Sequence, residues 1–131
     1  MAQLRCIIVT PEETAMEQES SFVVVPLFDG ELGVAPGHSP LIGRLGFGEL
    51  RLTASDGTKS RFYVDGGFVQ VANDVVTVLT GKTVPARDLD VAVAEEQLAE
   101  AMKRPVNTDE LLELRERAVL QARSQIRIAQ R

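Results

Sequence analysis

A nucleophilic enzyme would need Cys6, which is the one cysteine of this sequence, or a serine close to a base, and His38 is the one histidine. Cys6 lies in an apolar segment of strand length, which predicts a small buried side chain. His38 lies in the loop-like sequence 37–40 without an adjacent catalytic motif, which favours an orienting hydrogen bond or a partner contact. An esterase-like enzyme that uses Ser39 and His38 is therefore the most distant alternative. One cysteine and one histidine cannot form a zinc site or an internal disulfide, so we expect a reduced, metal-free protein.

Carboxylates and glycines offer two further kinds of site, and both have a simpler explanation. The acid pairs Asp88/Asp90 and Glu95/Glu96 could bind a hard cation. Acids are also common at helix starts and on exposed helix surfaces, and this explanation is favoured. The glycine-rich stretch 30–48 contains neither GxxxxGK[ST] nor a GxGxxG that leads into a helix pattern. The sequence therefore predicts no phosphate-binding loop.

The arginines near the C-terminus form a more informative pattern. Residues 117–131 contain four arginines and no acid. On a helix, Arg123, Arg127 and Arg131 recur every four residues and form one ridge. A solvated helix face is the ordinary explanation of such a run. The ridge could also dock on an acidic protein surface through charge-assisted hydrogen bonds.

The elements that position these groups must fit in 131 residues, enough for one domain or two small ones. Apolar residues at 44% and charged residues at 25% are typical of a folded globular chain whose core, without Trp, must be mostly aliphatic. The net charge of −5 disfavours nucleic-acid binding. The longest apolar run, 22–28, is interrupted by a proline and is far shorter than the ~20 residues that span a bilayer, so we expect no direct bilayer insertion.

Composition changes sharply along the chain. All ten glycines lie between Gly30 and Gly81, whereas eight alanines follow Pro85. Glycines mark turns and bulges in β proteins, while a glycine-free, alanine-rich segment favours helix. The sequence thus predicts a β part followed by an α part, with the boundary near residues 81–87.

In the first part, short β-branched and aromatic runs predict a small sandwich or barrel. Pro26 cannot donate to a sheet ladder, so its strand should lie at an edge or contain a bulge. Gly66 and Gly67 are expected to end one strand, and Asn73-Asp74 should form a hairpin turn. The expected strands are residues 4–9, 22–28, 48–53, 61–65, 68–72 and 75–80.

The second part predicts two helices. Asp88 is the expected N-cap of the first helix, and Pro105 ends it. Asn107 with Glu110 resembles a capping box that opens the second. A short turn between helices whose apolar stripes are partly alanine predicts an antiparallel hairpin. The expected stripe residues are Val91, Ala94, Leu98 and Ala101 in the first helix, and Leu112, Val119, Ala122, Ile126 and Ala129 in the second.

The motif order then points to a family. Residues 27–53, LFDGELGVAPGHSPLIGRLGFGELRLT, closely resemble the epsilon subunit of F-type ATP synthases, which is called delta in mitochondria. The likeness continues through the FYVDGGF segment 62–68, the NDVVTVL segment 73–79 and the DLD at 88–90. The resemblance implies a β-sandwich rotor-binding domain over residues 1–84 and an antiparallel two-helix regulatory hairpin over residues 85–131.

The resemblance also implies a function: a noncatalytic central-stalk (rotor) subunit that couples proton-driven c-ring rotation to ATP synthesis and restrains ATP hydrolysis. Its partners would be the gamma subunit, the c-subunit ring and the alpha/beta catalytic head, at the cytoplasmic side of the bacterial inner membrane. Glu31 and His38 would contact the c-ring or gamma, and Arg115, Arg123 and Arg127 would contact beta. The alternative is a stand-alone β-sandwich ligand-binding module with a helical dimerisation hairpin.

Some relatives bind regulatory ATP through an I/L-D-x-x-R-A motif. Leu89, Asp90 and Ala94 match that motif, but Val93 replaces its arginine. Loss of the guanidinium removes bidentate phosphate recognition, so no cofactor is expected and ATP binding should be weak or absent.

Overall fold

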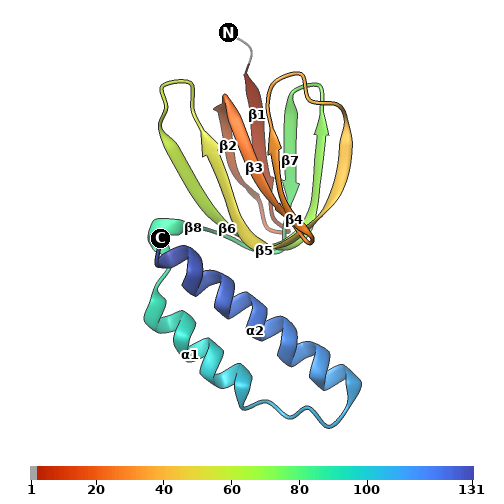
Figure 1. The fold of residues 1–131 in the computed structure, drawn as a ribbon, viewed down its shortest axis with the longest axis vertical. Helices are drawn as coiled ribbons and strands as arrows, with labels where there is room; N and C mark the ends of the chain where they lie inside the picture. The colour runs from red at the N-terminus through yellow and green to blue at the C-terminus, as the bar shows by residue number, and fades with distance from the viewer. Residues whose placement is uncertain (1–2) are drawn as a thin grey trace. The chain divides into compact units, whose positions relative to one another are not determined.

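Residues 3–131 are described by the computed structural model of this chain. The chain divides into two compact units, one ending at Pro85 and the other beginning at Ala86. The strands are β1 (Leu4–Val9), β2 (Thr14–Ser20), β3 (Phe22–Leu27), β4 (Gly30–Val34), β5 (Leu41–Thr53), β6 (Lys59–Ala72), β7 (Val75–Leu79) and β8 (Thr83–Pro85). The helical elements are the 3₁₀ turn η1 (Ala86–Asp88), α1 (Val91–Met102) and α2 (Asp109–Ala129) (Figure 1). The predicted sandwich and two-helix hairpin are thus confirmed.

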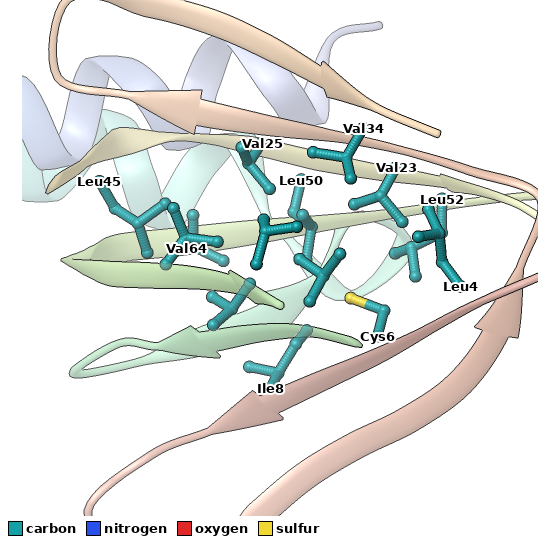
Figure 2. Packing of buried hydrophobic residues seen from close by; sticks show 14 residues of the cluster. Leu4, Cys6, Ile8, Val23, Val25, Val34, Leu45, Leu50, Leu52 and Val64 are labelled. Carbon is teal, nitrogen blue, oxygen red and sulfur yellow. The ribbon is translucent and has the colours of Figure 1, made fainter. Parts of the chain in front are cut away.

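The strands of the first unit form a sandwich around one aliphatic core. They pair in the order β2-β1-β7-β6-β5-β3-β4, and β8 pairs with β6. β1 and β7 run parallel, while the other pairs are antiparallel. Inward side chains meet in the interior, as Figure 2 shows for residues such as Cys6, Val25 and Leu50. The expected aliphatic core is confirmed, with Phe62 only partly buried against it.

Strand β6 differs from the sequence prediction. Gly66 and Gly67 were expected to end a strand, but β6 continues through both, with φ angles of 71° and 108°. A Cβ atom on Gly67 would lie 1.9 Å from the carbonyl oxygen of Leu79. The glycines therefore allow a kink and a close backbone approach within one long strand.

Two further predictions concern the strand that contains Pro26 and the turn at Asn73-Asp74. β3 lies between β4 and β5, so the edge position proposed for Pro26 is wrong, and the bulge is confirmed by a register shift between Val24 and Leu27. Asn73 and Asp74 have φ angles of 52° and 62° and join β6 to β7, as predicted. Strands β2, β4 and β8 were not predicted, because their sequences are polar, glycine-containing or very short.

The two helices pack against each other as an antiparallel hairpin (Figure 1). Both predicted N-caps are displaced. Asp88 belongs to η1, and Asp90 caps α1 because its carboxylate reaches the free amides there. Thr108 replaces Asn107 as the cap of α2 by accepting from the Leu111 amide at 3.1 Å.

The buried face of the hairpin only partly follows the predicted stripes. Ala94, Ala101 and Ala122 are buried as expected, whereas Leu112 is exposed. Ser124, Gln125 and Ile128 are also buried, so the buried face of α2 is broader than its apolar stripe.

Candidate functional site

Glu31 lies near the start of β4, opposite Pro26 of β3. Both of its carboxylate oxygens accept from the guanidinium of Arg51, at 2.6 Å to Nη1 and 3.1 Å to Nη2. The Glu31 side chain is 53% exposed. Its carboxylate is therefore held in a bidentate pair while the strand start remains accessible to a partner.

A buried carboxylate extends this pair into a row of alternating charges. The side chain of Glu49 is only 4% exposed and accepts from Arg51 Nη1 at 3.2 Å and from Arg61 Nε at 2.8 Å. The hydrogen bond to Glu31 raises the pKa of Arg51, and partial burial opposes it. From the sequence, Glu49 and Arg51 were expected only as part of the strand 48–53. The ion pairs that these two residues form with Glu31 and Arg61 depend on strand register, which the sequence did not predict.

His38 lies in the loop that follows β4, at the opposite end of that strand from Glu31. Its Nδ1 lies 2.7 Å from the carbonyl oxygen of Ser39, which requires a proton on Nδ1 because a carbonyl only accepts. The neighbouring Gly37 amide donates to Asp74 Oδ1 at 2.7 Å, which ties the loop to the β6–β7 turn. These contacts orient the loop, and the structure does not bring Glu31 and His38 together.

An exposed apolar face on the first unit was missed by sequence reasoning. Four large side chains there are 45–77% exposed: Phe28, Ile42, Phe68 and Leu79. Phe68 is the cross-strand partner of both Arg44 and Leu79, and the Arg44 guanidinium lies 5.7 Å from the centre of the Phe28 ring. Contiguous exposed apolar groups of this kind mark interaction surfaces. The strand pairing that gathers them was not readable from the sequence.

The hairpin carries the predicted arginines on and beside a groove of about 380 Å³. The groove is lined by Met102, Arg115, Glu116, Val119, Leu120 and Arg123. Arg115 Nη2 lies 3.7 Å from Met102 Sδ. Arg127 is exposed next to the groove, with its Nη2 3.5 Å from Ser124 Oγ. Thus Arg115 and Arg123 share one apolar groove, and Arg127 lies outside its lining.

The residues that match the nucleotide motif have a local structural role. Asp90 Oδ1 accepts from the amides of Ala92 and Val93, at 2.9 and 3.4 Å, and thereby caps α1. Val93 is 48% exposed and Ala94 is buried. The carboxylate of Asp90 is thus used to cap α1. The Val93 side chain has no hydrogen-bond donor that could bind a phosphate.

Other chemistry receives little support within residues 3–131. No three His, Cys, Asp or Glu side chains in this range gather in an arrangement that could hold a metal ion. Cys6 is fully buried, and burial raises the pKa of its thiol to about 12. Neither described helix is long and apolar enough to cross a bilayer.

Comparisons with known proteins cover both units. Residues 3–86 match the family model described as ATP synthase, Delta/Epsilon chain, beta-sandwich domain. A protein of Rhodopirellula baltica named ATP synthase epsilon chain is 50% identical over 124 residues, covering 95% of this chain and 96% of that protein. A protein of Granulibacter bethesdensis with the same name is 37% identical over 111 residues, covering 85% and 82%.

Two solved structures share the fold. A chain of the Euglena gracilis mitochondrial ATP synthase, described as OSCP/F1/c-ring, has a TM-score of 0.84 at 23% identity and covers 95% of this chain and 79% of that one. A chain of the Tetrahymena thermophila mitochondrial ATP synthase, described as central stalk/c-ring, has a TM-score of 0.74 at 12% identity, covering 96% of each. The sequence matches, which extend from the sandwich through the hairpin, show that this chain belongs to the ATP synthase delta/epsilon chain family.

Proposed function

We propose that this protein is a noncatalytic rotor subunit of an F-type ATP synthase, which couples c-ring rotation to ATP synthesis. The observation that carries the proposal is the 50% identity to a protein named ATP synthase epsilon chain, because the match spans both units of the chain. The fold neighbours come from assemblies described as containing a c-ring, and one is described as central stalk. As part of such an assembly, the subunit works at the cytoplasmic side of the bacterial inner membrane.

The sandwich supplies the rotor contacts in this proposal. The exposed apolar face formed by Phe28, Ile42, Phe68 and Leu79 has the character of a docking surface for the gamma subunit. The oriented loop of His38 belongs with this contact as well. The start of β4 at Glu31 meets the polar loops of the c-ring. The contact with the c-ring is supported by the exposure and charge of Glu31 at this end of the β3–β4 hairpin.

The hairpin supplies regulation in this proposal. Arg115 and Arg123 line an apolar groove, and Arg127 is exposed beside it. A combination of apolar contact and guanidinium groups suits an acidic surface of the beta subunit in the catalytic head. Docking there would oppose ATP hydrolysis. In this proposal the subunit itself performs no catalysis.

Regulatory ATP binding is absent or weak in this proposal. The chain offers Leu89, Asp90 and Ala94 of the motif, but Asp90 already caps α1 and Val93 lacks the guanidinium. The stand-alone ligand-binding module is not supported by the family relationship, and it predicts a different behaviour in the decisive experiment.

The proposal is tested by adding the purified chain to ATP synthase from which the epsilon subunit has been removed, in inverted membrane vesicles of its own source. We expect the chain to bind gamma and to restore ATP-driven proton pumping per ATP hydrolysed. A matched control is the Ile42→Glu variant, which places a charge on the apolar face and should bind gamma weakly. A chain that dimerises, fails to bind gamma and leaves pumping uncoupled would favour the stand-alone module instead.

A further inference from the structure

The β3–β4 hairpin is attached to the sheet by an interrupted backbone ladder. Within the described sheet, β4 comes last in the strand order and pairs with β3 alone. The pairing of β3 with β5 shifts register between Val24 and Leu27, a stretch that includes Pro26. Proline has no amide hydrogen to donate, and Glu31 is its partner on β4. The backbone ladder between β3 and β5 is therefore interrupted at Pro26, the residue that pairs with Glu31.

Arg51 bridges this weak point with its side chain. It lies on β5 opposite Val24, and its guanidinium reaches beyond β3 to the carboxylate of Glu31 on β4. The two N–H···O contacts, at 2.6 and 3.1 Å, use the planar fork of the guanidinium. A bidentate pair fixes direction as well as distance, which a point charge such as a lysine ammonium does not.

A second carboxylate, that of Glu49, also holds the guanidinium. Glu49 accepts from Arg51 Nη1 at 3.2 Å, and its side chain is 4% exposed. Arg61 donates to the other oxygen of Glu49 at 2.8 Å. A buried carboxylate that loses a cationic partner destabilises the fold, so Arg51 cannot swing away from this position without cost. Its orientation toward Glu31 is thus set by the sheet.

We propose that Arg51 is a positioning residue for the β3–β4 hairpin: it holds the carboxylate of Glu31 and so sets the shape of the hairpin that meets the rotor partner. This inference rests on the proposed function, because it takes the hairpin as a partner-facing element. The hairpin then engages its partner through a fixed shape, and Glu31 contributes through its pair with Arg51.

The test compares Arg51→Lys, Glu31→Gln and the double variant. Lysine keeps a positive charge beside buried Glu49, and this limits the risk of misfolding, but it lacks the planar fork of the guanidinium. Thermal melts check that each variant is folded. The matched control is Arg5→Lys, because Arg5 forms a strand-to-strand pair with Glu17 at 2.7 Å on β1 and β2, far along the sheet order from β4. Two quantities are measured: hydrogen exchange of the residue 30–34 amides in the isolated full chain, and ATP-driven proton pumping per ATP hydrolysed in the reconstituted enzyme.

We expect Arg51→Lys and Glu31→Gln each to speed exchange of these amides by roughly 2- to 5-fold, the size of a lost partly exposed ion pair. The double variant should exchange no faster than Arg51→Lys alone, because both single substitutions break the pair between Arg51 and Glu31. Proton pumping per ATP hydrolysed should fall in all three variants. Arg5→Lys should change neither the exchange of the residue 30–34 amides nor the pumping.

Other results overturn the inference in distinguishable ways. Additive effects in the double variant, or unchanged exchange in Arg51→Lys, would show that Arg51 does not hold the hairpin. Reduced pumping in Glu31→Gln with normal pumping in Arg51→Lys would show that Glu31 acts through its own charge. Faster exchange with normal pumping in every variant would reject the link between hairpin shape and the partner. If the unmodified chain restores no pumping, the proposed function fails, and hydrogen exchange alone decides whether Arg51 holds the hairpin.

Discussion

Gly67 lies directly against the backbone of Leu79, so a Cβ atom on Gly67 would come within 1.9 Å of the Leu79 carbonyl oxygen. The two residues belong to neighbouring strands, β6 and β7, and Gly67 has a φ angle of 108°. No L-residue side chain fits this position without a backbone shift. The position therefore requires glycine for two separate reasons, space and backbone conformation.

Gly67→Ala is expected to lower the free energy of unfolding by about 3 kcal/mol or more, from backbone strain together with the clash. The matched control is Gly57→Ala, where φ is 88° but nothing lies within 4 Å of the new Cβ. That variant should lose only about 1 to 2 kcal/mol, the cost of the left-handed conformation. Urea denaturation of the full chain measures both, and equal losses would contradict the role of the Leu79 carbonyl.

A chain that ends at Pro85 should fold cooperatively. The unit that ends there contains the aliphatic core and the β8 strand that pairs with β6. The remaining 86–131 fragment should be only partly helical, because short helices without a large core are marginal in water. Circular dichroism melts of the two fragments check this. A sandwich fragment without a cooperative melt would show that its stability depends on the hairpin.

The thiol of Cys6 should be unreactive in the folded chain. With a pKa near 12, its thiolate fraction at pH 8 is about one in ten thousand, and the side chain is fully buried. We expect no reaction with a thiol reagent at pH 8 until urea unfolds the protein, when one equivalent should react. Rapid labelling without denaturant would contradict the burial of Cys6.

The same pKa predicts a pH dependence of stability. The folded pKa of Cys6, about 12, is above the ordinary value of 9.0, so deprotonation favours the unfolded chain. The stability contributed by the neutral thiol is complete below pH 9 and is lost as the pH rises toward 12. Relative to Cys6→Ala, the natural chain should lose more free energy of unfolding between pH 8.5 and pH 10.5 in urea titrations at each pH. Parallel losses would contradict the raised pKa.

Replacing Arg115, Arg123 and Arg127 together with alanine should increase ATP hydrolysis by the reconstituted enzyme without releasing the subunit from gamma. An exposed ion pair contributes about 0 to 1 kcal/mol, so the triple variant should lose up to about 3 kcal/mol of the inhibitory contact. Added salt should have a similar effect on the unmodified enzyme. The measurement is the steady-state hydrolysis rate of assembled enzyme.

The control for this prediction removes three exposed cations elsewhere in the second unit, by replacing Arg87, Lys103 and Arg104 with alanine. This variant should hydrolyse ATP at the unmodified rate. A chain ending at Pro85 gives the fully released rate. If that truncation activates hydrolysis but the arginine variant does not, the hairpin inhibits by other contacts.

Val93→Arg should strengthen ATP binding to the isolated chain. Val93 is 48% exposed on the first turn of α1, so the substitution should not disturb packing. The natural chain should bind ATP weakly or not detectably in titration calorimetry, and the variant more tightly because it regains a bidentate donor. A low-micromolar dissociation constant for the natural chain, about −8 kcal/mol, would show that other residues form a nucleotide site.

Sequence reasoning succeeded where the signal was local or compositional. The shift from glycine to alanine predicted a β part and an α part, and the Asn73-Asp74 pair predicted a turn with positive φ angles. The ordered motifs in residues 27–53 pointed to the family that the comparisons confirm. Such features depend on backbone preferences and residue order, which need no knowledge of the partner strand.

Tertiary structure alone decided which residues meet across the sheet. Glu31, Arg51 and Arg61 are separated by 10 to 30 residues in sequence, yet they form one row of charges around Glu49 because β4, β3, β5 and β6 pair in that register. Strand register also gathers the exposed apolar face and turns Gly67 from an expected strand end into a close backbone contact. Register depends on the simultaneous packing of all the strands, so no local window of the sequence contains it.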